Sequence, residues 1–155
     1  MRFARPTGEA PHTPDQGLPV TGLDGTKTRW AAYASTEDKI TFERVPHLDW
    51  SAGRDYVLAY AACWVYSEKD QPVVAEMGVD GVGKLWLNRR PAVAEYKASG
   101  IWGRQRRAHV HLRAGWNEFL LKVANVKRPC RLCLELYATD GDGPPKGIRI
   151  TATPP

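Results

Sequence analysis

Two stretches of sequence decide the fold, and the first reads Gly78-Val79-Asp80-Gly81-Val82-Gly83-Lys84-Leu85-Trp86-Leu87-Asn88. The second lies farther along the chain and reads Gly115-Trp116-Asn117-Glu118-Phe119-Leu120-Leu121-Lys122-Val123. In each stretch, turn-forming glycine precedes residues that favour strands. Residues 117–123 alternate between two faces, and Gly115 can take the positive φ that ends a hairpin. Both stretches therefore predict a turn that leads into a strand.

Short runs of β-branched, aromatic or alternating residues occur along most of the chain. The expected strands are 56–66, 73–78, 84–88, 108–112, 117–124, 131–138 and 148–151, with 28–34 and 39–44 as further candidates. Turn-forming residues separate these runs, and no stretch shows convincing helical periodicity. Because each strand must lay an apolar face on a shared core, the pattern predicts an all-β, antiparallel two-sheet β-sandwich.

The length and composition fit one domain. The chain has 155 residues, 43% of them hydrophobic, which is enough to bury a core. Its early prolines predict that 1–27 is an irregular lead-in or linker and that 28–155 form a single sandwich domain. No apolar run reaches the roughly 18 to 20 residues of a membrane span, and residues 1–20 lack the apolar run of a secretory signal. We expect a module excised from a larger protein.

The quoted stretches and their flanks resemble the galactose-binding-like (jelly-roll) β-sandwich domains that bacterial glycosidases, polysaccharide lyases and surface proteins carry as accessory modules. Those domains tend to have a strand ending in Tyr-Ser, a strand ending in glycine, an Asp-Gly turn, an x-x-Trp-x-Asn strand and a later Gly-Trp-Asn-x-x-Leu-x-Lys-Val segment. The matching residues are Val65-Tyr66-Ser67, Glu76-Met77-Gly78, Asp80-Gly81, Lys84-Leu85-Trp86-Leu87-Asn88 and the stretch that begins at Gly115. The likeness covers about residues 50–150.

This resemblance implies a non-catalytic module that binds a polysaccharide or oligosaccharide, within a larger bacterial protein that is secreted or displayed at the cell surface. It implies no cofactor, although some related sandwiches carry a structural calcium ion. Trp86, Trp116, Gly78 and Gly115 belong to the shared pattern, so we assign them to fold maintenance. The alternative is a structural or interaction domain that packs against a catalytic domain of the same parent protein and has no ligand of its own.

The chain departs from the expected hairpin at Asn88-Arg89, where a two-residue turn would normally read Asn-Gly. We therefore expect a longer or different loop after Asn88, with the next strand at 108–112. The segment 89–113 holds seven basic residues and one acidic residue, a net charge of +6, whereas the rest of the chain has a net charge of −1.

Aromatic faces stack on sugar rings, and arginine pairs with carboxylate or sulfate. We predict a site for an acidic polysaccharide in this segment, with Tyr96 and Trp102 as stacking groups and Arg104, Arg106 and Arg107 as donors. Alternatively, Trp102 covers a sheet edge and the arginines form a solvated rim of edge strands. Nucleic acid is a disfavoured partner, because a net charge of +5 is modest for that role and no oligonucleotide-binding signature occurs.

Residues 56–66 predict a strand with two apolar faces, one in the core and the other under a loop or a neighbouring domain. An exposed row of aromatics on that strand would instead be a flat platform for sugar. Cys130 and Cys133 fall on opposite faces of a strand, which favours thiols packed beside a sheet over redox or zinc chemistry. A disulfide from Cys63 to either one is the alternative.

Catalysis has little support. His109 and His111 share a strand face, yet the sequence offers no third metal ligand beside them. The segment 140–143 reads Asp-Gly-Asp-Gly but lacks the glutamate that ends a calcium loop. Paired acids occur only in turn-like segments, where nothing raises one pKa or sets their separation. We expect a protein that is not an enzyme, with an enzyme fragment as the last alternative.

Overall fold

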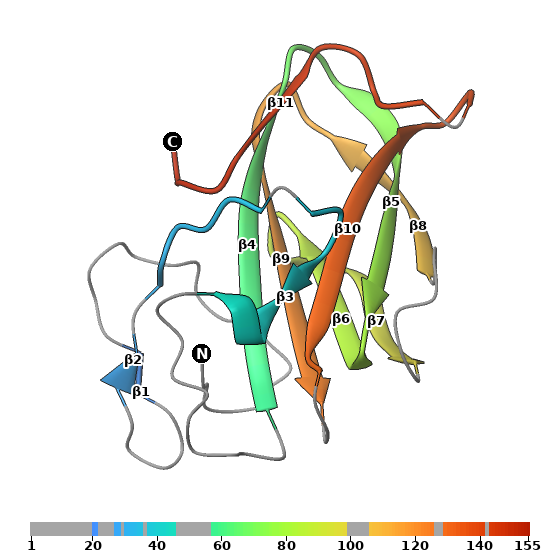
Figure 1. Ribbon diagram of the computed structural model, residues 1–155. Coiled ribbons are helices and arrows are strands. Elements are labelled where there is room, and N and C mark those ends of the chain that lie inside the picture. The colour runs from blue at the N-terminus through green and yellow to red at the C-terminus, as the bar shows by residue number, and fades with distance from the viewer. Residues whose placement is uncertain are drawn as a thin grey trace.

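The fold consists almost entirely of antiparallel strands. The computed structural model describes residues 20–21, 27–28, 30–35, 37–45, 57–98, 106–125, 129–141 and 143–155. The elements, in chain order, are β1 (Val20–Thr21), β2 (Lys27–Thr28), β3 (Ile40–Thr41), the 3-10 helix η1 (Phe42–Arg44), β4 (Val57–Ser67), β5 (Gln71–Val79), β6 (Gly81–Leu87), β7 (Arg90–Ala98), β8 (Arg106–Leu112), β9 (Gly115–Asn125), β10 (Arg131–Ala138) and β11 (Ile148–Thr151) (Figure 1). Among the described residues, no helix is long and apolar enough to cross a membrane.

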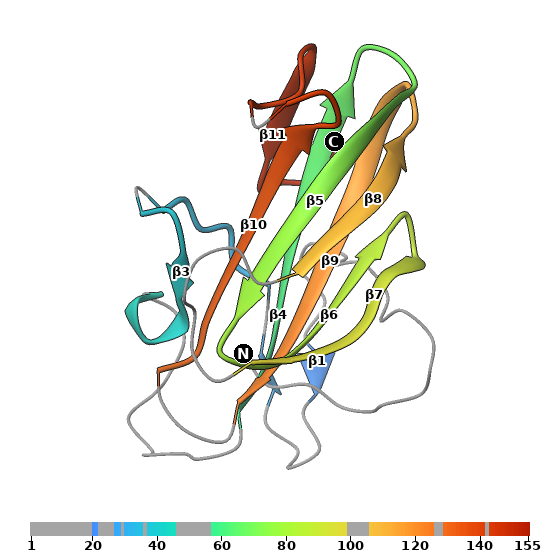
Figure 2. The same ribbon diagram turned by 90° about the vertical axis from the view of Figure 1, so that its right-hand side faces the viewer.

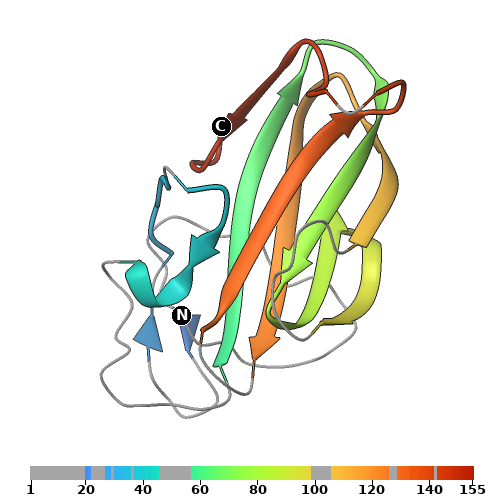
Figure 3. The ribbon, with the colours of Figure 1, turned by 45° about the vertical axis from the view of Figure 1, so that its right-hand side comes forward.

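Two sheets form the body of the protein. One has four strands in the order β3-β10-β5-β8, and the other has five in the order β11-β4-β9-β6-β7. Figures 2 and 3 show the two sheets lying face to face. The chain passes repeatedly between them, since β4, β6, β7, β9 and β11 belong to one sheet and β5, β8 and β10 to the other. The prediction of an all-β, antiparallel two-sheet sandwich is confirmed.

Alternating residues of the facing strands fill the space between the sheets. On β9, Phe119, Leu121 and Val123 are at most 2% exposed, as their alternation predicts, and β5 contributes four core residues with no exposed surface, namely Val73, Ala75, Met77 and Val79. The sheets approach closely at Gly83, where an added Cβ would lie 2.9 Å from both γ-methyl groups of Val79. Any larger residue there would require the Val79 side chain to shift.

The seven main strands expected from the sequence are confirmed as β4, β5, β6, β8, β9, β10 and β11. The two further candidates are shorter than expected. Within the range 28–34, Thr28 ends β2 and residues 30–34 form no strand, while β3 covers only two residues before η1 begins. Of the expected lead-in 1–27, residues 1–19 and 22–26 lie outside the described residues.

A tight hairpin joins β6 to β7, so the prediction of a longer loop after Asn88 is wrong. Leu87 pairs with Arg90, which leaves only Asn88 and Arg89 in the turn. Their φ angles are 49° and 66°, the left-handed conformation that a two-residue hairpin requires. Asparagine tolerates this conformation, whereas arginine adopts it at a cost that glycine would avoid. Most of the segment expected to be a loop is therefore the strand β7 and the start of β8.

Asn88 and Asn117, one from each of the two stretches that predict the fold, hold this hairpin in place. Asn88 Nδ2 donates to Asn117 Oδ1 at 2.9 Å, and Asn88 Oδ1 accepts from the backbone N–H of Glu118 at 2.9 Å. Asn117 is 0% exposed, and its side chain makes four more hydrogen bonds to backbone groups of β4 and of the turn between β8 and β9. Two turns that are distant in sequence are thereby fixed to each other.

A second apolar cluster covers part of the outer face of the five-stranded sheet. Tyr60, Trp86 and Leu120 are buried there, and Trp30 packs against them. Trp30 precedes β3 in the chain, so an N-terminal segment contributes to the cover of this face. Since Ala59 and its neighbours on the other face of β4 lie in the main core, β4 is buried on both faces over much of its length, as predicted.

Candidate functional site

The structure describes three of the five residues predicted to bind ligand. Tyr96 lies on β7 and packs, partly buried, against the main core. Arg106 and Arg107 are exposed at the start of β8. Trp102 and Arg104 lie outside the described residues. Tyr96 and the two described arginines therefore belong to edge strands of different sheets.

Arg107 is engaged with the protein itself. Its Nε donates to Glu76 Oε2 at 2.9 Å, and the Glu76 side chain is only 3% exposed. A buried carboxylate needs such a partner, because an unpaired charge away from water is expensive. The basic side chains at 89, 90, 97, 106, 107 and 113 are exposed and lie on β7, on β8 or in turns next to them. This placement fits the alternative interpretation, in which charges on edge strands oppose pairing with other chains.

An exposed aromatic group lies elsewhere, on the outer face of the five-stranded sheet. Trp116 is 43% exposed, so its indole is no part of the core, unlike Trp86 at 7%. Its ring meets the Tyr66 ring edge to face, with 5.4 Å between centroids and 69° between planes. Arg149 places its guanidinium carbon 4.6 Å from the centroid of the same Tyr66 ring. We call these three residues the Tyr66 row.

The sheet register builds the Tyr66 row. Tyr66 on β4 pairs with Trp116 on β9 and with Arg149 on β11, so the three side chains stand side by side across three neighbouring strands. Asn117 points inward, and the alternation along β9 therefore directs Trp116 outward. Farther along the same face, Trp64 is only 5% exposed and so adds no exposed ring to the Tyr66 row.

The sequence contained a signal for the Tyr66 row, although the prediction missed it. Once Asn117, Phe119 and Leu121 are assigned to the core face, Trp116 must lie on the opposite face. The shared motif led us to assign Trp116 to fold maintenance. In the structure, the motif's asparagines serve the fold, and its second tryptophan is available to a ligand.

Two lysines stand opposite each other farther along the outer face. Lys84 on β6 pairs in register with Lys122 on β9, and Lys122 Nζ lies 5.8 Å from the centroid of the Tyr60 ring. Burial, and then the charge of Lys84, lower the pKa of Lys122, while Glu95 acts in the opposite direction. Glu95 Oε2 is 3.9 Å from Lys84 Nζ. This one carboxylate balances only one of the two lysine charges, so the group of three keeps a net positive charge.

All three cysteines are free thiols, so neither alternative disulfide forms. Burial raises the pKa of Cys63 to about 12. Burial, and then the carboxylates of Glu43 and Asp80, raise the pKa of Cys130 to about 12. Thiols in this state are poor nucleophiles, because the reactive species is the thiolate.

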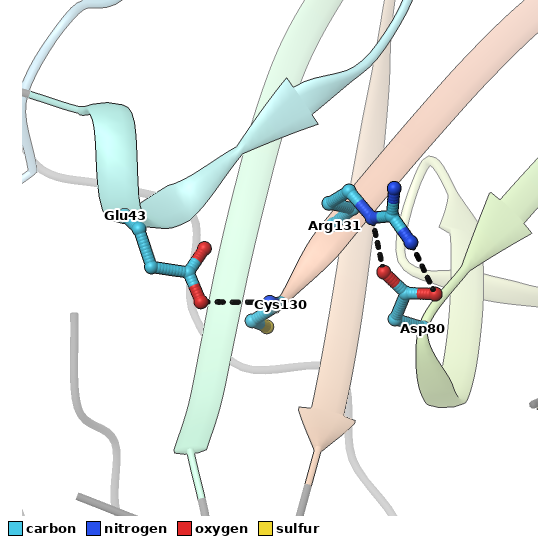
Figure 4. Close-up of polar contacts among 4 residues, drawn as sticks. All are labelled: Glu43, Asp80, Cys130 and Arg131. Carbon is cyan, nitrogen blue, oxygen red and sulfur yellow. Dashed lines mark hydrogen bonds and ion pairs between the residues drawn. The ribbon is translucent and has the colours of Figure 1, made fainter. Parts of the chain in front are cut away.

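Polar contacts tie Cys130 and its neighbour to other parts of the chain. Glu43 Oε1 accepts from the Cys130 backbone N–H at 2.9 Å, and Arg131 Nε donates to Asp80 Oδ2 at 2.5 Å; Figure 4 shows how these residues lie. Cys130 is 1% exposed and lies in the core, while Cys133 pairs with Gly78 one register step beyond the core residue Leu132. The two thiols thus lie on opposite faces, as predicted. The contacts of Cys130 and Arg131 with Glu43 and Asp80 hold parts of the fold together.

His109 and His111 are the two histidines whose spacing suits the start of a metal site. Both side chains are exposed on β8, two residues apart. Within the described ranges, no group of three or more His, Cys, Asp or Glu side chains is placed to hold a metal ion.

No protein-family model, curated protein or solved structure gives a significant match to this chain. The resemblance to galactose-binding-like domains stays a prediction that rests on the residues quoted above. The two-sheet sandwich, in contrast, follows from the strand pairings of this chain alone.

Proposed function

We propose that this chain is a non-catalytic carbohydrate-binding module, an accessory part of a larger secreted protein, and that the Tyr66 row is its ligand site. The observation that carries the proposal is the exposed indole of Trp116, held edge to face against Tyr66 on a rigid sheet. Tyrosine and tryptophan are enriched at recognition surfaces, because each has a large apolar ring and a polar group that can stay hydrated. An indole face offers an apolar surface on which the C–H face of a sugar ring can stack.

The scaffold supports this role. Trp116 is adjacent to Asn117, whose buried side chain makes hydrogen bonds to two turns and to β4. The backbone that carries the indole is therefore fixed before a ligand arrives, and little conformational entropy is lost on binding. Strands position recognition residues more accurately than loops do.

Affinity electrophoresis tests the proposal, using native gels that contain xylan, galactan, polygalacturonate, alginate or heparin. The protein is basic, with a net charge of +5, so acidic polymers retard it through charge alone. Trp116→Ala is therefore compared with Ile150→Ala, because both variants keep the net charge. Ile150 is 61% exposed on β11 and lies one residue from Arg149, on the opposite face of the strand.

We expect wild type and Ile150→Ala to be retarded equally by at least one polymer in 0.5 M salt. At this salt concentration the Debye length is about 3 to 5 Å, which suppresses non-specific electrostatic attraction. Trp116→Ala should then migrate as it does in a gel without polysaccharide. Equal retardation of Trp116→Ala would refute the proposed site. If no polymer retards the wild type at this salt concentration, the carbohydrate function itself is wrong, and a domain that packs on a partner through its exposed apolar residues becomes the better account.

A further inference from the structure

Arg149 gives the Tyr66 row a second chemical property. Its side chain is exposed, and its guanidinium lies over the Tyr66 ring with 4.6 Å from Cζ to the ring centroid. This cation–π contact restrains the guanidinium, and the N–H groups at its edge stay accessible. Within the described part of the chain, no carboxylate forms an ion pair with Arg149.

Trp116 and Arg149 flank Tyr66 from opposite sides. They lie on β9 and β11, which are separated by β4 alone, so their backbones are about 9 to 10 Å apart at the usual spacing of neighbouring strands. One end of the Tyr66 row is thus an apolar indole face, and the other is a cation with paired donors. A ligand that satisfies both ends has an apolar ring face and, beside it, an anionic group.

The charge of Arg149 gives the ligand a direction. Arg149 lies two strands away from the strand that carries the indole, at the other end of the Tyr66 row. Its positive charge attracts an anion, so the anionic group of a ligand should lie at the Arg149 end.

We infer that the Tyr66 row selects an acidic saccharide, whose ring stacks on Trp116 and whose carboxylate or sulfate pairs with Arg149. This inference rests on the proposed carbohydrate-binding function and adds the class of sugar and the residue that selects it. A planar guanidinium fork matches both anionic groups, and charge-assisted hydrogen bonds are about twice as strong as neutral ones. A neutral sugar would displace water from the Arg149 guanidinium without supplying an anion in its place, so it should bind less tightly than an acidic one.

Pairs of polymers that differ only in charge test the inference. Isothermal titration calorimetry in 0.15 M salt would compare polygalacturonate with its methyl ester, and alginate with its propylene glycol ester. Dextran sulfate, which carries sulfate and no carboxylate, tests sulfate as the anion. The variants are Arg149→Ala, Arg149→Lys, which keeps the charge without the fork, and Trp116→Ala. Arg113→Ala is the matched control. Arg113 is also exposed, and its substitution removes the same positive charge at a position outside the Tyr66 row.

We expect at least one acidic polymer to bind about tenfold more tightly than its ester, in line with the contribution of a hydrogen bond to a charged group. Arg149→Ala should abolish this preference, Arg149→Lys should retain part of it, and Arg113→Ala should leave it unchanged. Equal binding of acid and ester, or a preference that survives Arg149→Ala, would overturn the inference and leave carbohydrate binding intact. If the wild type bound neither the acidic polymers nor their esters, the proposed function itself would be overturned.

Discussion

Replacing Asn117 by alanine should destabilise the protein by about 4 kcal/mol. The Asn117 side chain is 0% exposed and takes part in five hydrogen bonds, four of them between 2.8 and 3.1 Å. Each such bond contributes about 1 kcal/mol net, and buried groups left without a partner cost somewhat more. Since small domains are stable by roughly 5 to 15 kcal/mol, the variant should fold but be marginal.

Urea unfolding followed by tryptophan fluorescence and circular dichroism measures this change. A double-mutant cycle with Asn88→Ala isolates the contact between the two asparagines, for which we expect a coupling free energy of about 1 kcal/mol. Asn88→Ala alone removes two hydrogen bonds and should cost about 2 kcal/mol. If Asn117→Ala lost less than about 1 kcal/mol, with an unchanged m-value, the proposed role of this network in holding the two turns would be refuted.

Three smaller predictions follow from the turn, the lysine pair and the thiols. Arg89→Gly relieves a φ of 66° and should stabilise the protein by about 0.5 to 1 kcal/mol, seen as a rise of about 2 °C in Tm, whereas no rise would contradict the turn geometry. Because the pKa of Lys122 is lowered on folding, the unfolded chain binds the proton more tightly, so stability should rise with pH toward the ordinary lysine pKa near 10.5. Lys122→Met should accordingly raise the unfolding free energy at pH 7 by about 0.2 to 1 kcal/mol. A lower unfolding free energy of the variant would show that repulsion between Lys122 and Lys84 does not destabilise the protein. With pKa values of about 12, Cys63 and Cys130 should react with a disulfide reagent at pH 8 only after unfolding in urea, and rapid labelling of the native protein would contradict their burial.

The strands could be predicted from sequence wherever one face alternates into the core. Phe119, Leu121 and Val123 are an example, because their period of two residues matches the pleat of the sheet. Strand β7 was missed for a local reason. Its turn uses Arg89 at a position where glycine is usual, and the hydrogen bonds of Asn88 that support this conformation involve residues about thirty positions away. Such distant partners are not visible in a local pattern.

The candidate site was harder to predict than the fold. Charge and aromatic content drew attention to 89–113, but Arg107 serves the buried Glu76 and Tyr96 packs on the core. The Tyr66 row depends on register, since Tyr66, Trp116 and Arg149 come together only when β4, β9 and β11 pair as they do. Alternation alone could have placed Trp116 on the outer face, yet its neighbours across the strands could not be known without the pairing.

Nuclear magnetic resonance provides the most direct test that the Tyr66 row is the ligand site. Amide and indole N–H resonances of the ¹⁵N-labelled protein would be followed during titration with an oligosaccharide of the acidic polymer that binds the wild type most tightly. We predict that the largest shifts occur at the indole N–H of Trp116 and at amides next to Tyr66 and Arg149. Shifts centred instead on β7 and β8, around Tyr96 and Arg106, or no shifts at any concentration, would contradict the account.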